Sequence, residues 1–132
     1  MGSRIPVYAA SRHHVFVATV LIVDDHPSFR ATARAILEAD GFEVVGEAED
    51  GTSAVEAVHR LRPDVVLLDV QLPDMDGFTV ATTLGVNGYM PTIVLTSSRD
   101  AADFGPLVHE CGARGFVPKA ELSGAALHAV LR

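Results

Sequence analysis

The chain has 132 residues, of which 48% are hydrophobic, and it carries a formal net charge of −7. This length and apolar content indicate one folded domain with its own core, and the acidic balance argues against direct binding of nucleic acid or of an anionic membrane. One cysteine excludes an intramolecular disulfide and is typical of a reducing compartment such as the cytoplasm, and no apolar run approaches the ~18–20 residues that span a membrane.

The first residues differ in pattern from the rest of the chain. Residues 1–17 contain two arginines but no apolar core followed by a cleavage-like site, so they do not form a signal peptide. We expect an N-terminal tail over 1–17 and one domain over 18–132.

Five short apolar segments alternate with helical patterns along this domain. The segment 65–68 has four bulky aliphatic residues in a row, which favours a strand buried on both faces. The predicted strands are 18–23, 42–48, 64–69, 91–96 and 115–118. The predicted helices run from Pro27 to a stop at Gly41, over 52–61, from Phe78 to the glycines at 85–88, from a cap at Asp100 to Gly112, and over 122–131. Such alternation predicts an α/β fold, a doubly wound parallel sheet with helices on both faces.

Polar side chains stand at the carboxyl ends of the first, third, fourth and fifth predicted strands. In a doubly wound sheet of order 2-1-3-4-5, the carboxyl ends of strands one, three, four and five lie side by side and form a cleft. The residues delivered there are Asp24 and Asp25, Asp69, Thr96 and Ser97, and Lys119.

This set of side chains is suited to phosphoryl chemistry. Three carboxylates repel one another unless a divalent cation such as Mg²⁺ binds between them. Thr96 and Lys119 are donors for phosphoryl oxygens, and a reachable carboxylate such as Asp69 can attack phosphorus.

Four motifs in this order resemble the receiver domain of two-component response regulators. They are Val23-Asp24-Asp25-His26, Leu68-Asp69-Val70-Gln71-Leu72-Pro73-Asp74-Met75-Asp76-Gly77, Leu95-Thr96-Ser97 and Gly115-Phe116-Val117-Pro118-Lys119. The resemblance covers about 18–131 and implies a flavodoxin-like, five-stranded sheet of order 2-1-3-4-5 with five helices.

The resemblance also implies a role for each motif residue. Asp69 would be the phosphoacceptor, Asp25 the direct Mg²⁺ ligand, and Asp24 the partner of a metal-bound water, with Asp69 itself and the backbone carbonyl of Gln71 as further ligands. Thr96 and Lys119 would bind phosphoryl oxygens. Phe116 matches the aromatic switch position, and Thr96 would act with it. Ala120 follows the lysine where many receivers have proline.

The function implied is a signalling switch. A histidine kinase or a phosphotransfer protein would phosphorylate Asp69 in a Mg²⁺-dependent step, and the product would change partner binding or dimerisation. Such a chain would be no enzyme beyond its own phosphorylation and dephosphorylation.

Three alternatives stay open. The motifs at Asp24-Asp25-His26-Pro27 and Pro118-Lys119 look like those of receivers with a helix-turn-helix output domain, so the chain could be the receiver half of a DNA-binding regulator. A phosphatase with an aspartyl nucleophile needs a second Asp two residues later, where Gln71 stands. A flavodoxin-like cofactor-binding module would explain the fold without the chemistry.

Other polar residues of the same regions have simpler explanations. Asp74 and Asp76 lie in a Pro- and Gly-rich loop and are predicted to be turn and cap residues. His26 is predicted to pack at the start of a helix, and Cys111 to be a structural thiol.

Overall fold

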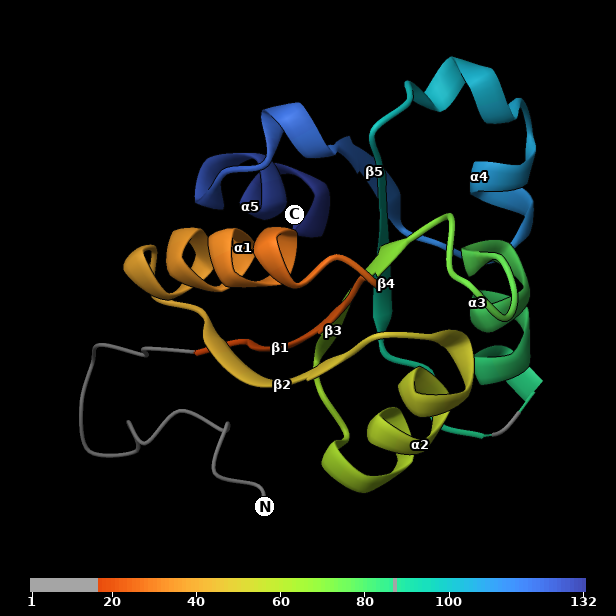
Figure 1. The fold of residues 1–132 in the computed structure, drawn as a ribbon, viewed down its shortest axis with the longest axis horizontal. Helices are drawn as coiled ribbons and strands as arrows, with labels where there is room; N and C mark the ends of the chain where they lie inside the picture. The colour runs from red at the N-terminus through yellow and green to blue at the C-terminus, as the bar shows by residue number, and fades with distance from the viewer. Residues whose placement is uncertain (1–16, 87) are drawn as a thin grey trace.

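Five parallel strands form one sheet in the order β2-β1-β3-β4-β5, which confirms the predicted topology. The computed structural model describes residues 17–86 and 88–132, and the statements below concern that part of the chain. The strands are β1 Thr19–Val23, β2 Glu43–Ala48, β3 Val65–Asp69, β4 Thr92–Ser97 and β5 Gly115–Pro118 (Figure 1). The predicted tail at 1–17 lies outside the described residues except for Val17.

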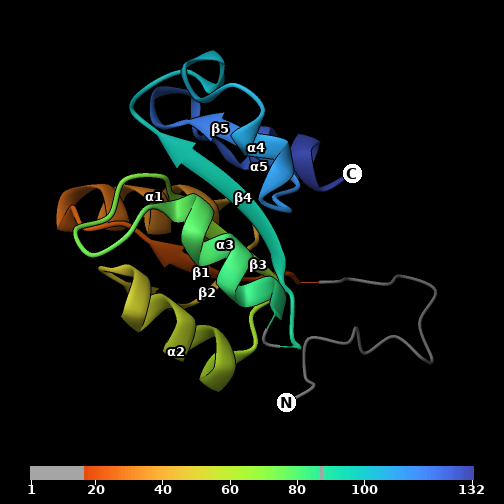
Figure 2. The same cartoon turned by 90° about the vertical axis from the view of Figure 1, so that its right-hand side faces the viewer.

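Helices cover both faces of the sheet (Figures 1 and 2). One face packs against α1 (Pro27–Ala39) and α5 (Gly124–Leu131), and the other against α2 (Gly51–Leu61), α3 (Gly77–Val86) and α4 (Leu107–Glu110). Five helices around a five-stranded sheet are the layers expected for a doubly wound fold. No helix in the described ranges has the length and apolar character needed to cross a membrane.

The core confirms that β3 is buried on both faces. All five of its residues are buried, and alternate side chains enter different clusters. Val66 and Leu68 pack toward α2 and α3, whereas Val65 and Leu67 pack toward α1 and α5. Because side chains alternate along a strand, an uninterrupted aliphatic run is what a sheet covered on both faces requires.

The fourth predicted helix is wrong as a continuous element. A 3₁₀ helix over Ala101–Phe104 ends at Gly105, whose φ is +59°, and α4 begins only after Pro106 and lasts four residues. Glycine readily adopts this backbone conformation, and proline has no N–H to continue a helical hydrogen-bond ladder. This break leaves α4 a single turn long.

The start of the last helix also differs from the prediction. Residues Lys119–Glu121 form a 3₁₀ turn, and α5 begins at Gly124, two residues later than expected. Ser123 determines this start because its Oγ accepts a hydrogen bond of 2.9 Å from the Ala126 N–H. Leu122 is buried, although it precedes the helix.

Candidate functional site

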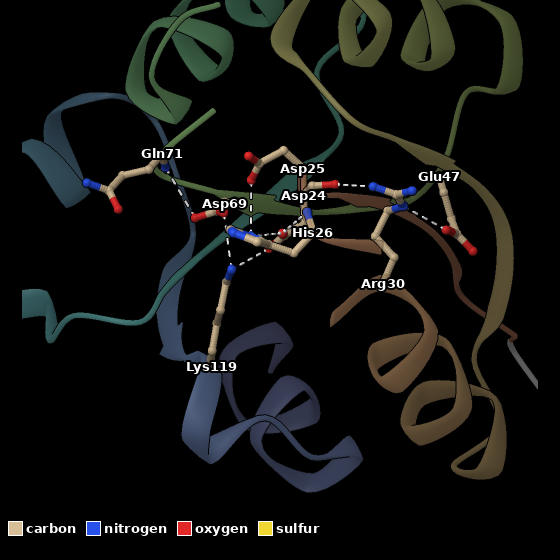
Figure 3. Close-up of polar contacts among 8 residues, drawn as sticks. All are labelled: Asp24, Asp25, His26, Arg30, Glu47, Asp69, Gln71 and Lys119. Carbon is tan, nitrogen blue, oxygen red and sulfur yellow. Dashed lines mark hydrogen bonds and ion pairs between the residues drawn. The ribbon is translucent and has the colours of Figure 1, made fainter. Parts of the chain in front are cut away.

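The carboxyl ends of β1, β3, β4 and β5 meet at one edge of the sheet, as the strand order requires. Asp24 follows β1, and Asp69 is the last residue of β3 and pairs in register with Thr96 of β4. Lys119 follows β5 directly. In Figure 3 its side chain extends from the end of β5 toward Asp24 and Asp69. Residues 95 positions apart in the chain are thus within hydrogen-bonding distance.

Lys119 bridges the two buried carboxylates. Its Nζ lies 2.6 Å from Asp24 Oδ2 and 3.2 Å from Asp69 Oδ2, and it also lies 4.6 Å from the centre of the Phe29 ring. Burial alone would lower the pKa of Lys119, but the contact with Asp24 and the charges of Asp69 and Asp24 raise it. The site therefore holds an ammonium ion that stays protonated.

Asp69 is only 3% exposed and has few donors. Its Oδ1 accepts one hydrogen bond of 3.2 Å from the Gln71 N–H. Burial is the largest influence on this carboxyl and raises its pKa to about 6; the Asp24 charge acts in the same direction, and the Gln71 N–H and Lys119 oppose it. Asp69 is therefore a carboxylate that gains from any added positive charge.

Asp24 is fully buried, but it accepts more hydrogen bonds than Asp69 does. Its Oδ1 accepts 2.8 Å from the His26 N–H, and its backbone carbonyl accepts 2.6 Å from Arg30 Nη1. Burial alone would raise the pKa of Asp24, but the hydrogen bonds from Lys119 and His26 and the Lys119 charge hold that pKa below its ordinary value. The two buried carboxyls thus have pKa values displaced in opposite directions.

Thr96 carries an unsatisfied polar group beside these carboxylates. The residue is fully buried, and its Oγ1 has no hydrogen-bond partner among the described residues. A buried hydroxyl without a protein partner costs free energy unless a water or another group supplies one, so Thr96 is available as a donor at this edge.

Four side chains of this edge could hold a metal ion. One potential ligand atom from each of Asp24, Asp25, His26 and Asp69 lies within 4.8 Å of the others. The Asp25 side chain is 35% exposed and opens this group to solvent. Oxygen donors and partial access to water suit a hard divalent cation such as Mg²⁺, so the residues fit the expected metal.

His26 has a position that the sequence prediction described only in part. It is the N-cap residue of α1, as expected for a residue at a helix start. Its Nδ1 also lies 3.0 Å from Asp24 Oδ1 and 3.1 Å from Asp25 Oδ1. The imidazole therefore contacts oxygens that a cation would use.

Two predicted residues lie beside this group and do not contact it through their side chains. Gln71 is exposed, and its backbone N–H is the group that contacts Asp69. Phe116 is partly buried on β5, and its ring centre lies 5.9 Å from that of Phe104. The ring centre of Phe104 in turn lies 5.6 Å from that of Phe78.

Sequence reasoning missed the structural importance of Gly77. A Cβ at this position would lie 2.5 Å from the Asp69 carbonyl oxygen, so only glycine lets α3 begin directly against the acceptor strand. The Gly77 N–H donates 2.7 Å to the Val70 carbonyl. The sequence predicts only a Pro- and Gly-rich loop here, although the motif Asp76-Gly77 carries this signal.

The loop after β3 is also tied to a distant helix. The carboxylate of Asp74 accepts hydrogen bonds from the Gly51 N–H (2.7 Å), the Thr52 N–H (3.0 Å) and the Thr52 hydroxyl (2.9 Å) at the start of α2. Asp76 caps α3 by accepting 2.7 Å from the Thr79 N–H. Both are therefore cap residues, as predicted, although the partner of Asp74 could not be identified from local sequence.

Comparison with known proteins agrees with this geometry. A model of the response regulator receiver domain matches residues 20–132. The DNA-binding transcriptional activator EvgA of Escherichia coli K12 is 37% identical over 101 residues, which are 76% of this chain and 50% of EvgA. A protein-glutamate methylesterase/protein-glutamine glutaminase of Alkalilimnicola ehrlichii is 39% identical over 112 residues, 79% of this chain and 28% of that protein.

Solved structures give the same result. The signal receiver domain of the putative response regulator NarL from Mycobacterium tuberculosis superimposes with a TM-score of 0.77 at 33% identity, covering 87% of this chain and 97% of that domain. The chain spans half or less of the length of the curated relatives named above, and nearly all of the receiver domain. The chain belongs to the response regulator receiver domain family.

Proposed function

We propose that this chain is a phosphorylation-controlled switch whose phosphoacceptor is Asp69. The observation that carries the proposal is the environment of this carboxyl: it is buried, has a pKa raised to about 6, and lies 3.2 Å from the Lys119 ammonium and in register with the unpartnered hydroxyl of Thr96. Formation of an acyl phosphate would remove the charge of this buried carboxylate, and the phosphoryl oxygens could accept hydrogen bonds from Lys119 and Thr96.

The reaction is a transfer to the carboxylate. An oxygen of Asp69 attacks the phosphorus of a phosphohistidine on the donor protein, the phosphorus–nitrogen bond breaks, and the imidazole leaves and takes up a proton. Water later attacks the phosphorus of the acyl phosphate, which releases inorganic phosphate and restores the carboxylate. Asp69 therefore ends the cycle unchanged.

Lys119 and Thr96 are the donors for the transferred group. Lys119 already lies within reach of Asp69, and a small shift of its ammonium brings it to a phosphoryl oxygen. The Thr96 hydroxyl gains its missing partner by donating to another oxygen. Both contacts exist only when the phosphoryl group is present, so they stabilise the phosphorylated state.

The acidic side chains would hold the cation. We assign Mg²⁺ to Asp25, Asp69 and the backbone carbonyl of Gln71, with Asp24 holding a metal-bound water. When bound, the ion offsets the negative charge that accumulates on the transferred group. The mutual proximity of the carboxylates, within 4.8 Å, supports this assignment.

Phe116 is our candidate for the element that transmits the change. Movement of Thr96 toward the phosphoryl group would vacate space next to β5, into which the Phe116 ring can turn. Its contact with Phe104 supports this role, because any rotation of Phe116 must alter that contact.

The partners are a sensor histidine kinase or a phosphotransfer protein on the input side, and a second copy or another protein on the output side. EvgA is named as a DNA-binding transcriptional activator, and this chain matches half of it. This match supports the alternative function, in which the chain is the receiver half of a regulator and controls a DNA-binding output domain. Sequencing the native gene past codon 132 tests it.

The methylesterase relative is an enzyme, but the chain matches only 28% of that protein. We therefore propose no activity beyond self-phosphorylation and its reversal, and a cytoplasmic location.

The direct test is phosphorylation by a small donor. Incubation with acetyl phosphate and Mg²⁺ should add about 80 Da, the mass of one phosphoryl group, and removal of Mg²⁺ by a chelator should prevent the addition. The variant Asp69→Asn should remain unmodified, whereas the matched variant Asp103→Asn, at an exposed position, should behave as the wild type. Full modification of Asp69→Asn would overturn the assignment.

A turnover assay distinguishes a phosphatase from a phosphorylation-controlled switch. A chain that hydrolyses phosphomonoesters needs an acid near the leaving group, and the residue two positions after Asp69 is the exposed amide Gln71. We expect no sustained release of phosphate from p-nitrophenyl phosphate. Sustained turnover that is lost in Asp69→Asn would mean that the protein is a phosphatase and not a switch.

A further inference from the structure

The exposed apolar side chains of this protein gather on one side. In the described ranges, three large apolar residues are exposed: Val86 (79%), Met90 (41%) and Leu107 (45%). Val86 ends α3, and Leu107 begins α4. The Met90 thioether lies beside Gly85 and Gly112, at the ends of the same two helices. Single apolar residues scattered over a surface are normal, whereas exposed apolar residues that cluster indicate a site for a ligand or a partner protein.

A groove of about 540 Å³ lies between α3 and α4 at this place. Phe78, Val86 and Leu107 supply its apolar lining, and Thr79, Thr82 and Thr83 line it with hydroxyl and methyl groups. Gly105 and Pro106 separate the 3₁₀ helix from α4, so only one turn of α4 lies opposite the ten residues of α3.

The charge of the groove has one sign. Among the described residues that line the groove, Asp76 and Glu110 are charged, and none is a lysine or an arginine. Two copies of this face would bring carboxylates together, which disfavours a symmetric contact between copies of this chain. A partner with positive charge beside an apolar stripe fits both properties of the groove.

Two chains of contacts lead from the groove, one to the carboxylate edge and one to Phe116 on β5. Asp76, in its lining, precedes Gly77, which packs against the Asp69 backbone. Phe78, also in the lining, contacts Phe104, which contacts Phe116. An occupant of the groove would therefore touch Asp76, which adjoins Gly77 at the acceptor, and Phe78, the first ring of the row that ends at Phe116.

We propose that the α3–α4 groove is the docking surface for a basic amphipathic helix of a partner protein. Apolar side chains spaced three and four residues apart on that helix would enter between Phe78, Val86 and Leu107. Lysine or arginine side chains flanking the apolar stripe would meet Asp76 and Glu110. The proposal concerns binding alone and does not depend on Asp69 being phosphorylated.

The test uses a synthetic helix of about 18 residues, or five turns, with leucines on one face and lysines on the other. Its fluorescein-labelled form should bind the full chain in an anisotropy titration, and a scrambled peptide of the same composition should bind far more weakly. Amide chemical shifts should change in α3 and α4. These shifts locate the bound peptide independently of any variant.

Exposed positions provide variants that will still fold. Val86→Ser, which removes apolar contact without changing charge, should weaken binding about tenfold. Glu110→Lys should weaken it about fivefold. The matched variant Glu43→Lys makes the same charge change on β2, at the opposite edge of the sheet, and should have less than about a twofold effect.

Each other outcome overturns the proposal. Absence of peptide binding at low salt would exclude a basic amphipathic occupant. Equal weakening by Glu110→Lys and Glu43→Lys, with no effect of Val86→Ser, would mean that the peptide binds through net charge alone. If the amide chemical shifts of α3 and α4 change with protein concentration in the absence of peptide, the groove binds a second copy of this chain.

Discussion

Ionisation of Asp69 should cost the folded protein free energy. Its pKa is about 6 in the folded state against 3.8 for the free residue, so the folded state holds the proton more tightly. The cost is absent below pH ~4, grows between pH ~4 and ~6, and is constant above, at about 3 kcal/mol. Asp69→Asn removes it and should therefore stabilise the metal-free protein at pH 7.5 by up to about 3 kcal/mol, with little effect at pH 4.

Urea unfolding in the presence of a chelator measures this difference. Circular dichroism is the suitable signal, because the chain has no tryptophan. Asp103→Asn, at an exposed site, should show no such growth in stability between pH 4 and pH 7.5. A stabilisation by Asp69→Asn that does not depend on pH would show that the charge of Asp69 is not its cause.

His26 should compete with the cation. Its Nδ1 contacts Asp24 Oδ1 and Asp25 Oδ1, and these oxygens cannot serve the imidazole and a metal in the same geometry. His26→Ala keeps the backbone N–H that supports Asp24 and removes the imidazole. We expect Mg²⁺ to bind about fivefold more tightly, which corresponds to the loss of one modest hydrogen bond.

Calorimetric titration of the metal-free protein with Mg²⁺ tests the competition directly. His59→Ala is the matched control, because His59 is exposed on α2, away from the carboxylates. Weaker Mg²⁺ binding by His26→Ala would mean that the imidazole assists the cation.

At the scale of an element, Gly77 joins α3 to the acceptor strand. A methyl group there would press on the Asp69 carbonyl oxygen at 2.5 Å and on Val70 Cα at 3.0 Å, both of them backbone atoms. We expect Gly77→Ala to destabilise the protein by about 1–3 kcal/mol, the usual cost of overpacking, and to slow phosphorylation by acetyl phosphate.

Gly85 provides a control in the same helix. The nearest atom to a Cβ at Gly85 is the flexible Met90 Sδ, at 3.9 Å. Gly85→Ala should be neutral or should stabilise the protein by up to about 1 kcal/mol through helix propensity. Equal unfolding midpoints for the two variants in urea would refute the close packing of Gly77.

Strands and their ends were the elements that sequence predicted well. A buried parallel strand needs a continuous aliphatic run, and the first polar residue after that run must lie at the sheet edge, as Asp24 and Asp69 do. Helix interruptions were harder. The segment 100–112 has helical periodicity, but Gly105 and Pro106 break it, and a pattern of apolar spacing does not include the backbone restrictions of those residues.

Contacts between loops could not be predicted. The hydrogen bonds from Gly51 and Thr52 to Asp74 join residues 22 and 23 positions apart, and nothing in the local pattern of either loop identifies the other. The same is true of Lys119, which lies nearer to Asp24 than to Asp69. Strand order brings these groups to one edge, but side-chain packing decides which pairs are in contact.

At the scale of the whole molecule, the acceptor and the α3–α4 groove should be energetically coupled if both proposals hold. The coupling path is the row of rings at Phe116, Phe104 and Phe78, of which Phe78 lines the groove. Beryllofluoride with Mg²⁺, which imitates a phosphoryl group on a carboxylate, should change the affinity of the leucine–lysine peptide about fivefold or more.

Reciprocity makes this last prediction strict. The peptide must change the affinity for beryllofluoride by the same factor, because both effects measure one coupling free energy. Phe104→Leu, which removes the middle ring, should leave peptide binding to the free protein nearly unchanged and reduce the factor toward one. Phe42→Leu makes the same substitution on the opposite face of the sheet and should preserve the factor. Coupling that survives Phe104→Leu would have to pass through Asp76 and Gly77, the other connection between the groove and Asp69.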